Sequence, residues 1–133
     1  MNTGSTLRRT HRRVARGMGP TVIAIGLLAA CRGTDRPATS EWTDEWNDAR
    51  ELVPTERQFA EGGRRYCDQL LGRLRTQLPG LTPAPFESID APLDAWSNHF
   101  RTLAFECPSD PTVITRRLSQ LHDFESEIGA VLP

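Results

Sequence analysis

The sequence predicts an all-α fold, namely a small bundle of three long helices plus one short N-terminal helix, with one disulfide. Apolar residues recur every three or four positions through most of residues 41–133, and residues typical of helix starts and stops bound each periodic segment. No segment alternates between apolar and polar residues over the length of a strand. A chain of 133 residues with 38% hydrophobic residues supports one domain and excludes a multidomain enzyme.

The short helix is expected to begin at Glu41 with Ser40 as its N-cap, and to end before Pro54. Its apolar face has spacings of four, three and four residues: Trp42, Trp46, Ala49 and Val53. Two tryptophans one turn apart either pack against the bundle, which is the more common arrangement, or form a docking surface for a partner. The acidic residues around them disfavour contact with anionic lipid.

The second and longest helix is expected over residues 56–78. Thr55 and Gln58 form the T-x-x-Q capping-box pattern at its start. Gly62 and Gly63 each weaken a helix by about 1 kcal/mol relative to alanine, so a bend or the close approach of a neighbouring helix is expected there. The apolar residues that follow the capping box are Phe59, Tyr66, Cys67, Leu70, Leu71, Leu74 and Leu78.

Residues 79–89 contain three prolines and a glycine, which predicts an ordered but irregular crossing loop that includes Phe86. Asp90 is expected to cap the third helix, and Pro108 to stop it. Its apolar residues form a single seam: Leu93, Trp96, Phe100, Leu103 and Cys107. Asp110 and Pro111 are expected to start the last helix. The buried side of this last helix should comprise Ile114, Leu118, Leu121, Phe124, Ile128 and Val131.

The first 30 residues have the three-part layout of a secretory signal peptide. Residues 1–19 are basic, residues 20–30 are apolar and uncharged, and small residues end the apolar run. An apolar run of 11 residues is too short to cross a bilayer as a stable helix. Two arginine pairs precede it without the apolar residues usual after a twin-arginine signal, which leaves the export route open.

The four residues Leu28-Ala29-Ala30-Cys31 resemble the lipobox of bacterial lipoproteins. The resemblance implies that the Cys31 thiol receives a diacylglyceryl group and that a signal peptidase cuts between Ala30 and Cys31. It covers only the first 31 residues. The alternative is cleavage nearby with Cys31 as a structural thiol. On the lipobox interpretation, residues 1–30 are a removed signal peptide, residues 31–40 are the lipidated cysteine and a flexible tether, and residues 41–133 are the helical bundle domain.

The distribution of charge along the chain argues against binding of nucleic acid. All 16 basic residues are arginine, and five of them precede residue 31, where no acidic residue occurs. The chain from residue 31 onward contains the other 11 arginines and all 17 acidic residues, so its net charge is negative. A nucleic-acid module needs a positive charge. Arginines cluster in the second and last helices, where they either form a solvated face with intrahelical pairs to Glu61 and Asp68 or bind an anionic partner: Arg64, Arg65, Arg73, Arg75, Arg116 and Arg117.

Cys67 and Cys107 lie on the apolar faces of two consecutive helices, and with Cys31 assigned to lipid they are the remaining cysteines. In an oxidising compartment they are expected to form a disulfide. The alternative is a redox-active pair, but no C-x-x-C motif supports it.

The sequence contains no recognisable catalytic, phosphate-binding or dinucleotide-binding motif, so no enzymatic activity, cofactor or metal is expected. Two functional hypotheses follow. The first is a membrane-anchored extracytoplasmic lipoprotein whose helical module binds an envelope protein or ligand, with Trp42, Trp46 and Phe86 as its binding surface. The second is a small metal-binding protein or enzyme that uses His99, Glu106 and His122. A passive spacer is a third possibility.

Overall fold

The computed structural model describes residues 35–133. The expected signal peptide and the lipobox with Ala30 and Cys31 lie outside the described residues. Within the described part, four α-helices and one short 3₁₀ helix follow one another: α1 (Thr39–Arg50), α2 (Glu56–Gln77), η1 (Leu78–Leu81), α3 (Glu87–Glu106) and α4 (Pro111–Val131). The prediction of an all-α bundle with one short N-terminal helix is confirmed.

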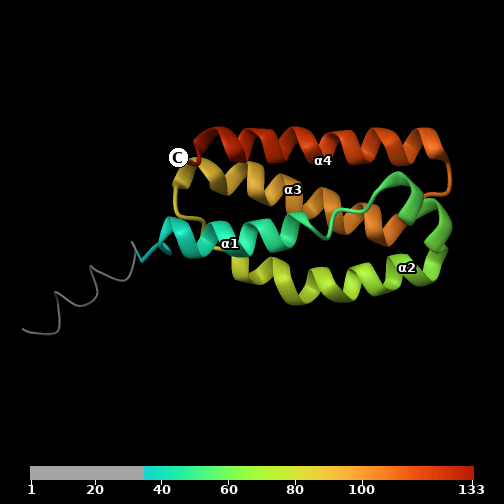
Figure 1. Ribbon diagram of the computed structural model, residues 1–133, viewed down its shortest axis with the longest axis horizontal. Helices are drawn as coiled ribbons and strands as arrows, with labels where there is room; N and C mark the ends of the chain where they lie inside the picture. Colours follow the sequence, from blue (N-terminus) through green and yellow to red (C-terminus); the bar gives the residue numbers. More distant parts are fainter. Residues whose placement is uncertain (1–34) are drawn as a thin grey trace, which may run out of the picture. The chain divides into compact units, whose positions relative to one another are not determined.

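The helices run alternately up and down along a common direction (Figure 1). Each connection is short, as in an up-and-down helical bundle. Helices α3 and α4 pack most extensively against each other, while α2 packs against both of them and α1 packs on η1. Asp35, the start of α3 and the end of α4 therefore all lie at one end of the bundle (Figure 1).

The start of α2 agrees with its capping-box pattern. The Gln58 backbone N–H donates to Thr55 Oγ1 at 3.2 Å, and the Gln58 side-chain oxygen accepts from the Thr55 backbone N–H at 3.0 Å. The expected bend is also present, because Gly63 has φ 57° and ψ −154°, a conformation open only to glycine. The Asp110 carboxylate likewise caps α4 by accepting from Thr112 N–H at 2.8 Å.

Helix α3 begins earlier than expected. Phe86 is its N-cap and Asp90 lies within its first turn, so the prediction of Asp90 as the cap was wrong. The physical reason is the burial of Ile89, which is fully enclosed and whose N–H donates to the Phe86 carbonyl at 3.0 Å. Packing of this side chain holds residues 87–89 in the helix. The crossing loop is correspondingly shorter and begins with η1.

The core runs the length of the bundle and is built around aromatic rings. Trp46 stacks on Trp42 with ring centroids 5.7 Å apart and meets Trp96 edge-on at 4.8 Å, and Trp96 meets Phe100 edge-on at 5.3 Å. Three tryptophans from α1 and α3 thus meet in the interior. No buried polar side-chain atom of the described residues lacks a hydrogen-bond partner.

Candidate functional site

The disulfide predicted between Cys67 and Cys107 is present. It joins the middle of α2 to the residue that ends α3, with the two Cα atoms 5.9 Å apart. Cys107 adopts the left-handed conformation of a helix C-cap, with φ 48°. The bond thus fixes the end of α3 against α2. Cys67 is fully buried in the core and Cys107 is partly buried against it, which supports a structural role.

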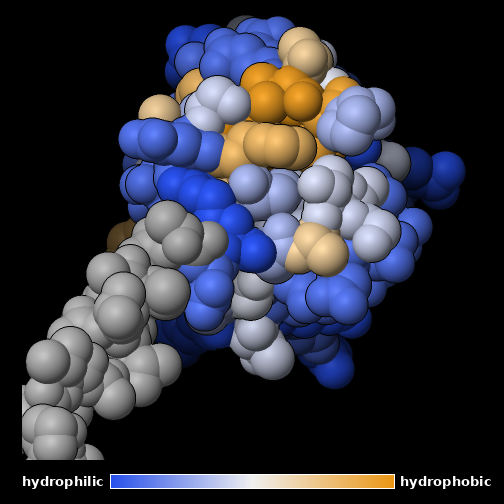
Figure 2. All heavy atoms as spheres, turned by 90° about the vertical axis from the view of Figure 1, so that its left-hand side faces the viewer, coloured by the Kyte–Doolittle hydropathy of each residue, from blue (hydrophilic) through white to orange (hydrophobic). Residues whose placement is uncertain are grey.

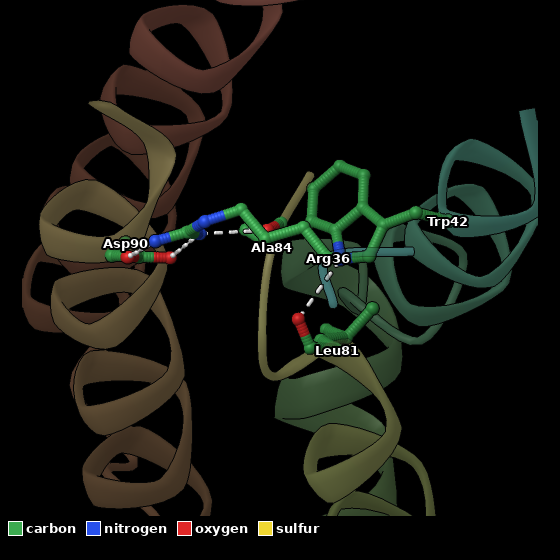
Figure 3. Close-up of polar contacts among 5 residues, drawn as sticks. All are labelled: Arg36, Trp42, Leu81, Ala84 and Asp90. Atoms are coloured by element: carbon green, nitrogen blue, oxygen red, sulfur yellow. Dashed lines mark hydrogen bonds and ion pairs between the residues drawn. The ribbon is translucent and has the colours of Figure 1, made fainter. Parts of the chain in front are cut away.

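Trp42 and Trp46 do not form a binding surface. Each is only 1% exposed, and the Trp42 indole N–H donates to the carbonyl of Leu81 at 2.9 Å (Figure 3). This hydrogen bond satisfies the polar end of the ring inside the bundle, so the ring can be buried at low cost. The face with spacings of four, three and four residues is thus the core face of α1. Of the three residues expected at the surface, only Phe86 is exposed, at 38%.

The candidate metal or catalytic residues are not brought together. The His99 Nε2 lies 2.6 Å from the side-chain oxygen of Gln120, whereas His122 Nδ1 pairs with Glu125 at 3.1 Å. Gln120 and His122 are separated by about 200° around α4. His99, which belongs to α3 and contacts Gln120, therefore lies on a different side of α4 from the His122 side chain. Glu106 instead pairs with Arg117.

The described residues do not form a metal-binding cluster elsewhere either. Among residues 35–133, no three histidine, cysteine, aspartate or glutamate side chains are grouped closely enough to hold a metal ion. The hypothesis of a site built from His99, Glu106 and His122 is therefore not supported by the geometry. In the same part of the chain, no helix has the length and apolar character needed to cross a membrane.

The segment expected to be a flexible tether is partly bound to the bundle. The Arg36 guanidinium donates to the carbonyl oxygen of Ala84 at 2.8 Å and to both carboxylate oxygens of Asp90 at 3.1 and 3.0 Å (Figure 3). Helix α1 also begins at Thr39, earlier than Glu41, and its N-cap is Ala38 and not the expected Ser40. Residues 35–40 therefore belong to the folded domain, and the prediction of a flexible tether over all of residues 31–40 was too long.

This contact changes the acidity of both partners. The hydrogen bond from Arg36 holds the pKa of the Asp90 carboxyl below its usual value, against a smaller opposing effect of burial. The pKa of Arg36 is raised, mainly by the same hydrogen bond and additionally by the negative charges of Asp90 and Glu87. Both residues are thus charged at neutral pH, and the ion pair holds the entering chain against the start of α3.

An apolar groove lies between α2 and α3 and was not predicted. It has a volume of about 420 Å³, and its apolar lining is Leu71, Leu74 and Phe105. Phe105 is 67% exposed, more than any other large hydrophobic side chain in the described residues. The remaining lining residues are polar or charged: Arg75, Arg101, Thr102 and Glu106. Exposed aromatic side chains beside arginines are typical of binding surfaces.

The arginines of this region fall into two groups. Arg64 pairs with Asp68 at 3.3 Å within α2, as expected for a solvated helix face, and also donates to the Phe105 carbonyl at 2.9 Å. Arg75 and Arg101 both border the groove, and neither has an ion-pair partner among the described residues. Since Glu106 is neutralised by Arg117, the groove presents an excess of positive charge.

Sequence reasoning missed Phe105 for an identifiable reason. The apolar seam of α3 passes through Leu103 and ends at Cys107, and Phe105 lies off that seam. An aromatic residue on the polar side of an amphipathic helix is the signal that could have revealed it.

Comparison of the chain with known proteins found no matching family model, no similar curated protein and no similar solved structure.

Proposed function

We propose that this chain is a bacterial lipoprotein, anchored through a diacylglyceryl group on Cys31 at the extracytoplasmic face of a membrane, whose helical bundle binds an envelope protein. The support for the anchor is the lipobox-like Leu28-Ala29-Ala30-Cys31 after an apolar run. The disulfide between Cys67 and Cys107 is consistent with an oxidising compartment.

The groove between α2 and α3 carries the binding part of the proposal. Phe105 exposes two thirds of its surface beside Leu71, and an exposed aromatic side chain of this kind gains stability when a partner covers it. Arg75 and Arg101 border the same groove. The groove therefore favours a partner that presents an apolar side chain with carboxylates beside it. The proposed partner therefore presents a short segment that combines apolar and acidic residues. We propose binding rather than catalysis.

Photo-crosslinking in living cells tests the binding site. Thr102 lines the groove and is exposed, so Thr102→benzoylphenylalanine places a photoreactive group there while leaving Phe105 in position. Irradiation is expected to join the chain to one envelope protein, at a segment that contains Asp or Glu beside an apolar residue. No protein adduct, or an adduct at a segment without acidic residues, would contradict the proposal.

A charge-reversed variant provides the second arm. Arg75→Glu with Arg101→Glu should reduce the adduct yield about tenfold, because two surface charge contacts together contribute about 1.4 kcal/mol. The matched control is Arg73→Glu with Arg116→Glu, which makes the same change of charge on exposed residues outside the groove. Equal losses in both variants would show that overall charge, and not the groove, determines the adduct yield.

A further inference from the structure

We propose that the end of the bundle at which the chain enters rests against the lipid surface through Phe86, Val131 and Leu132, which we call the entry-end surface. The inference rests on the proposed lipidation of Cys31 and goes beyond it. It specifies which part of the domain touches the membrane and therefore which part faces away from it.

The length of chain between the anchor and the bundle limits where the bundle can be. Asp35 is four residues after Cys31, and four residues span at most about 14 Å when fully extended. The next residue, Arg36, is held by hydrogen bonds to Ala84 in the preceding loop and to Asp90 at the start of α3 (Figure 3). A lipid group on Cys31 would thus hold this end of the bundle within about 14 Å of the point of attachment.

The same end is the one that exposes apolar side chains. Phe86 is 38% exposed at the start of α3. Val131, which we expected on the buried side of the last helix, is 37% exposed at the end of α4. Leu132 follows directly and is only partly buried. Figure 2 looks onto this end and shows hydrophobic residues gathered on the side where α4 lies. Apolar side chains at a lipid interface gain stability by leaving water.

The charges near this surface are compensated only in part. The carboxylate of Asp90 pairs with the guanidinium of Arg36 at 3.0 Å, whereas Glu87, which an anionic bilayer would repel, has no ion-pair partner among the described residues. The apolar contact does not have to hold the protein on the membrane by itself. Because the anchor makes the contact intramolecular, a small apolar surface is sufficient to set the orientation.

The orientation has a consequence for the groove. Thr102 lies 16 residues after Phe86 in α3, and 16 residues of α-helix span about 24 Å. The groove is therefore displaced along the bundle from the entry-end surface and stays open to a protein partner while Phe86 contacts lipid.

The test compares photoreactive groups at the two ends of α3 in the full chain, expressed in a bacterial envelope. Phe86→benzoylphenylalanine is expected to form phospholipid adducts on irradiation, detected as a mass increase of the intact protein, whereas Thr102→benzoylphenylalanine forms none. Val131→benzoylphenylalanine is a second probe of the same surface, in case the change at the helix cap prevents folding. Lipid adducts at Thr102 as frequent as at Phe86 and Val131 would overturn the inference.

The same samples separate the two proposals. If Cys31 carries diacylglyceryl but neither Phe86 nor Val131 probes yield lipid adducts, the entry-end surface does not contact the membrane and the proposed anchor stands. If the mass of the unirradiated chain shows no lipid on Cys31, the anchor fails and the inferred orientation fails with it.

Discussion

The guanidinium of Arg36 forms two hydrogen bonds with the carboxylate of Asp90, at 3.1 and 3.0 Å, although the residues are 54 positions apart in the chain. Arg36 also donates to the carbonyl of Ala84 in the preceding loop. Through these bonds the entering chain is held against the start of α3, close to the exposed ring of Phe86. The contact links the proposed anchor to the orientation of the bundle.

Replacing Asp90 by asparagine should lower stability in a pH-dependent way. The folded-state pKa of Asp90 is depressed, so the ion pair contributes fully above about pH 4 and its contribution is lost as the pH falls through that lowered pKa. Asp90→Asn should therefore unfold at a lower urea concentration than the parent at pH 7, and the gap should narrow in acid. Asp94→Asn is the control, because Asp94 is exposed one turn later and has no ion-pair partner among the described residues. A gap that persists unchanged at low pH would contradict the assignment.

Alanine at two glycines of α2 should change stability in opposite directions. Gly63 has a positive φ that alanine rarely adopts, so Gly63→Ala should destabilise the protein by about 1–3 kcal/mol. Gly72 lies in regular helix with open space around its Cα, so Gly72→Ala should stabilise it by up to about 1 kcal/mol. Urea unfolding of both variants measures the two changes. If Gly63→Ala also stabilised the protein, the assignment of a bend in α2 at Gly63 would be contradicted.

Truncation of Trp46 should be severely destabilising. Its ring contacts Trp42 and Trp96 and is 1% exposed, so Trp46→Ala should cost about 3–5 kcal/mol. Phe105→Ala is the matched control, since truncating a ring that is 67% exposed should change stability by less than about 0.5 kcal/mol. Circular dichroism follows both unfolding transitions without relying on tryptophan fluorescence. If Trp46→Ala left the free energy of unfolding nearly unchanged, the hypothesis that this residue lies at the surface would be restored.

Removal of the disulfide should also lower stability strongly. The cysteines are 40 residues apart, and closing a loop of that length stabilises the folded state by about 4 kcal/mol in the chain-entropy model. Cys67→Ser should lose about this amount, and adding a thiol reductant to the parent protein should produce the same loss. If the reductant had no effect on the parent while Cys67→Ser was destabilised, the serine itself and not the lost bond would be responsible.

Local signals in the sequence were sufficient to predict the four helices and the starts of two of them. The capping box of Thr55 and Gln58 marked the start of α2, and Asp110 followed by Pro111 marked the start of α4. The single apolar seam of α3 was also correct, as was the pairing of the cysteines. These features depend on neighbouring residues or on helical periodicity, which is why they can be read without a structure.

The errors arose where distant contacts override local preferences. Asp90 has the chemistry of a helix cap, but its carboxylate is bound by Arg36, far away in sequence, and Ile89 packing extends α3 toward its N-terminus. The candidate site changed for a similar reason. Trp42 can be buried because its indole N–H donates a hydrogen bond to the carbonyl of Leu81. Leu81 is 39 residues away, so no local sequence pattern predicts this contact. The groove beside Phe105 requires α2 and α3 to lie side by side, which periodicity alone does not establish.

The most direct test of the proposed function is the intact mass of the chain purified from bacterial membranes, together with the same measurement on Cys31→Ser. We expect a wild-type chain that begins at Cys31 and carries a diacylglyceryl group there, and a Cys31→Ser chain without any lipid. A wild-type chain that begins at another residue, or that carries an unmodified Cys31, would contradict the lipoprotein assignment.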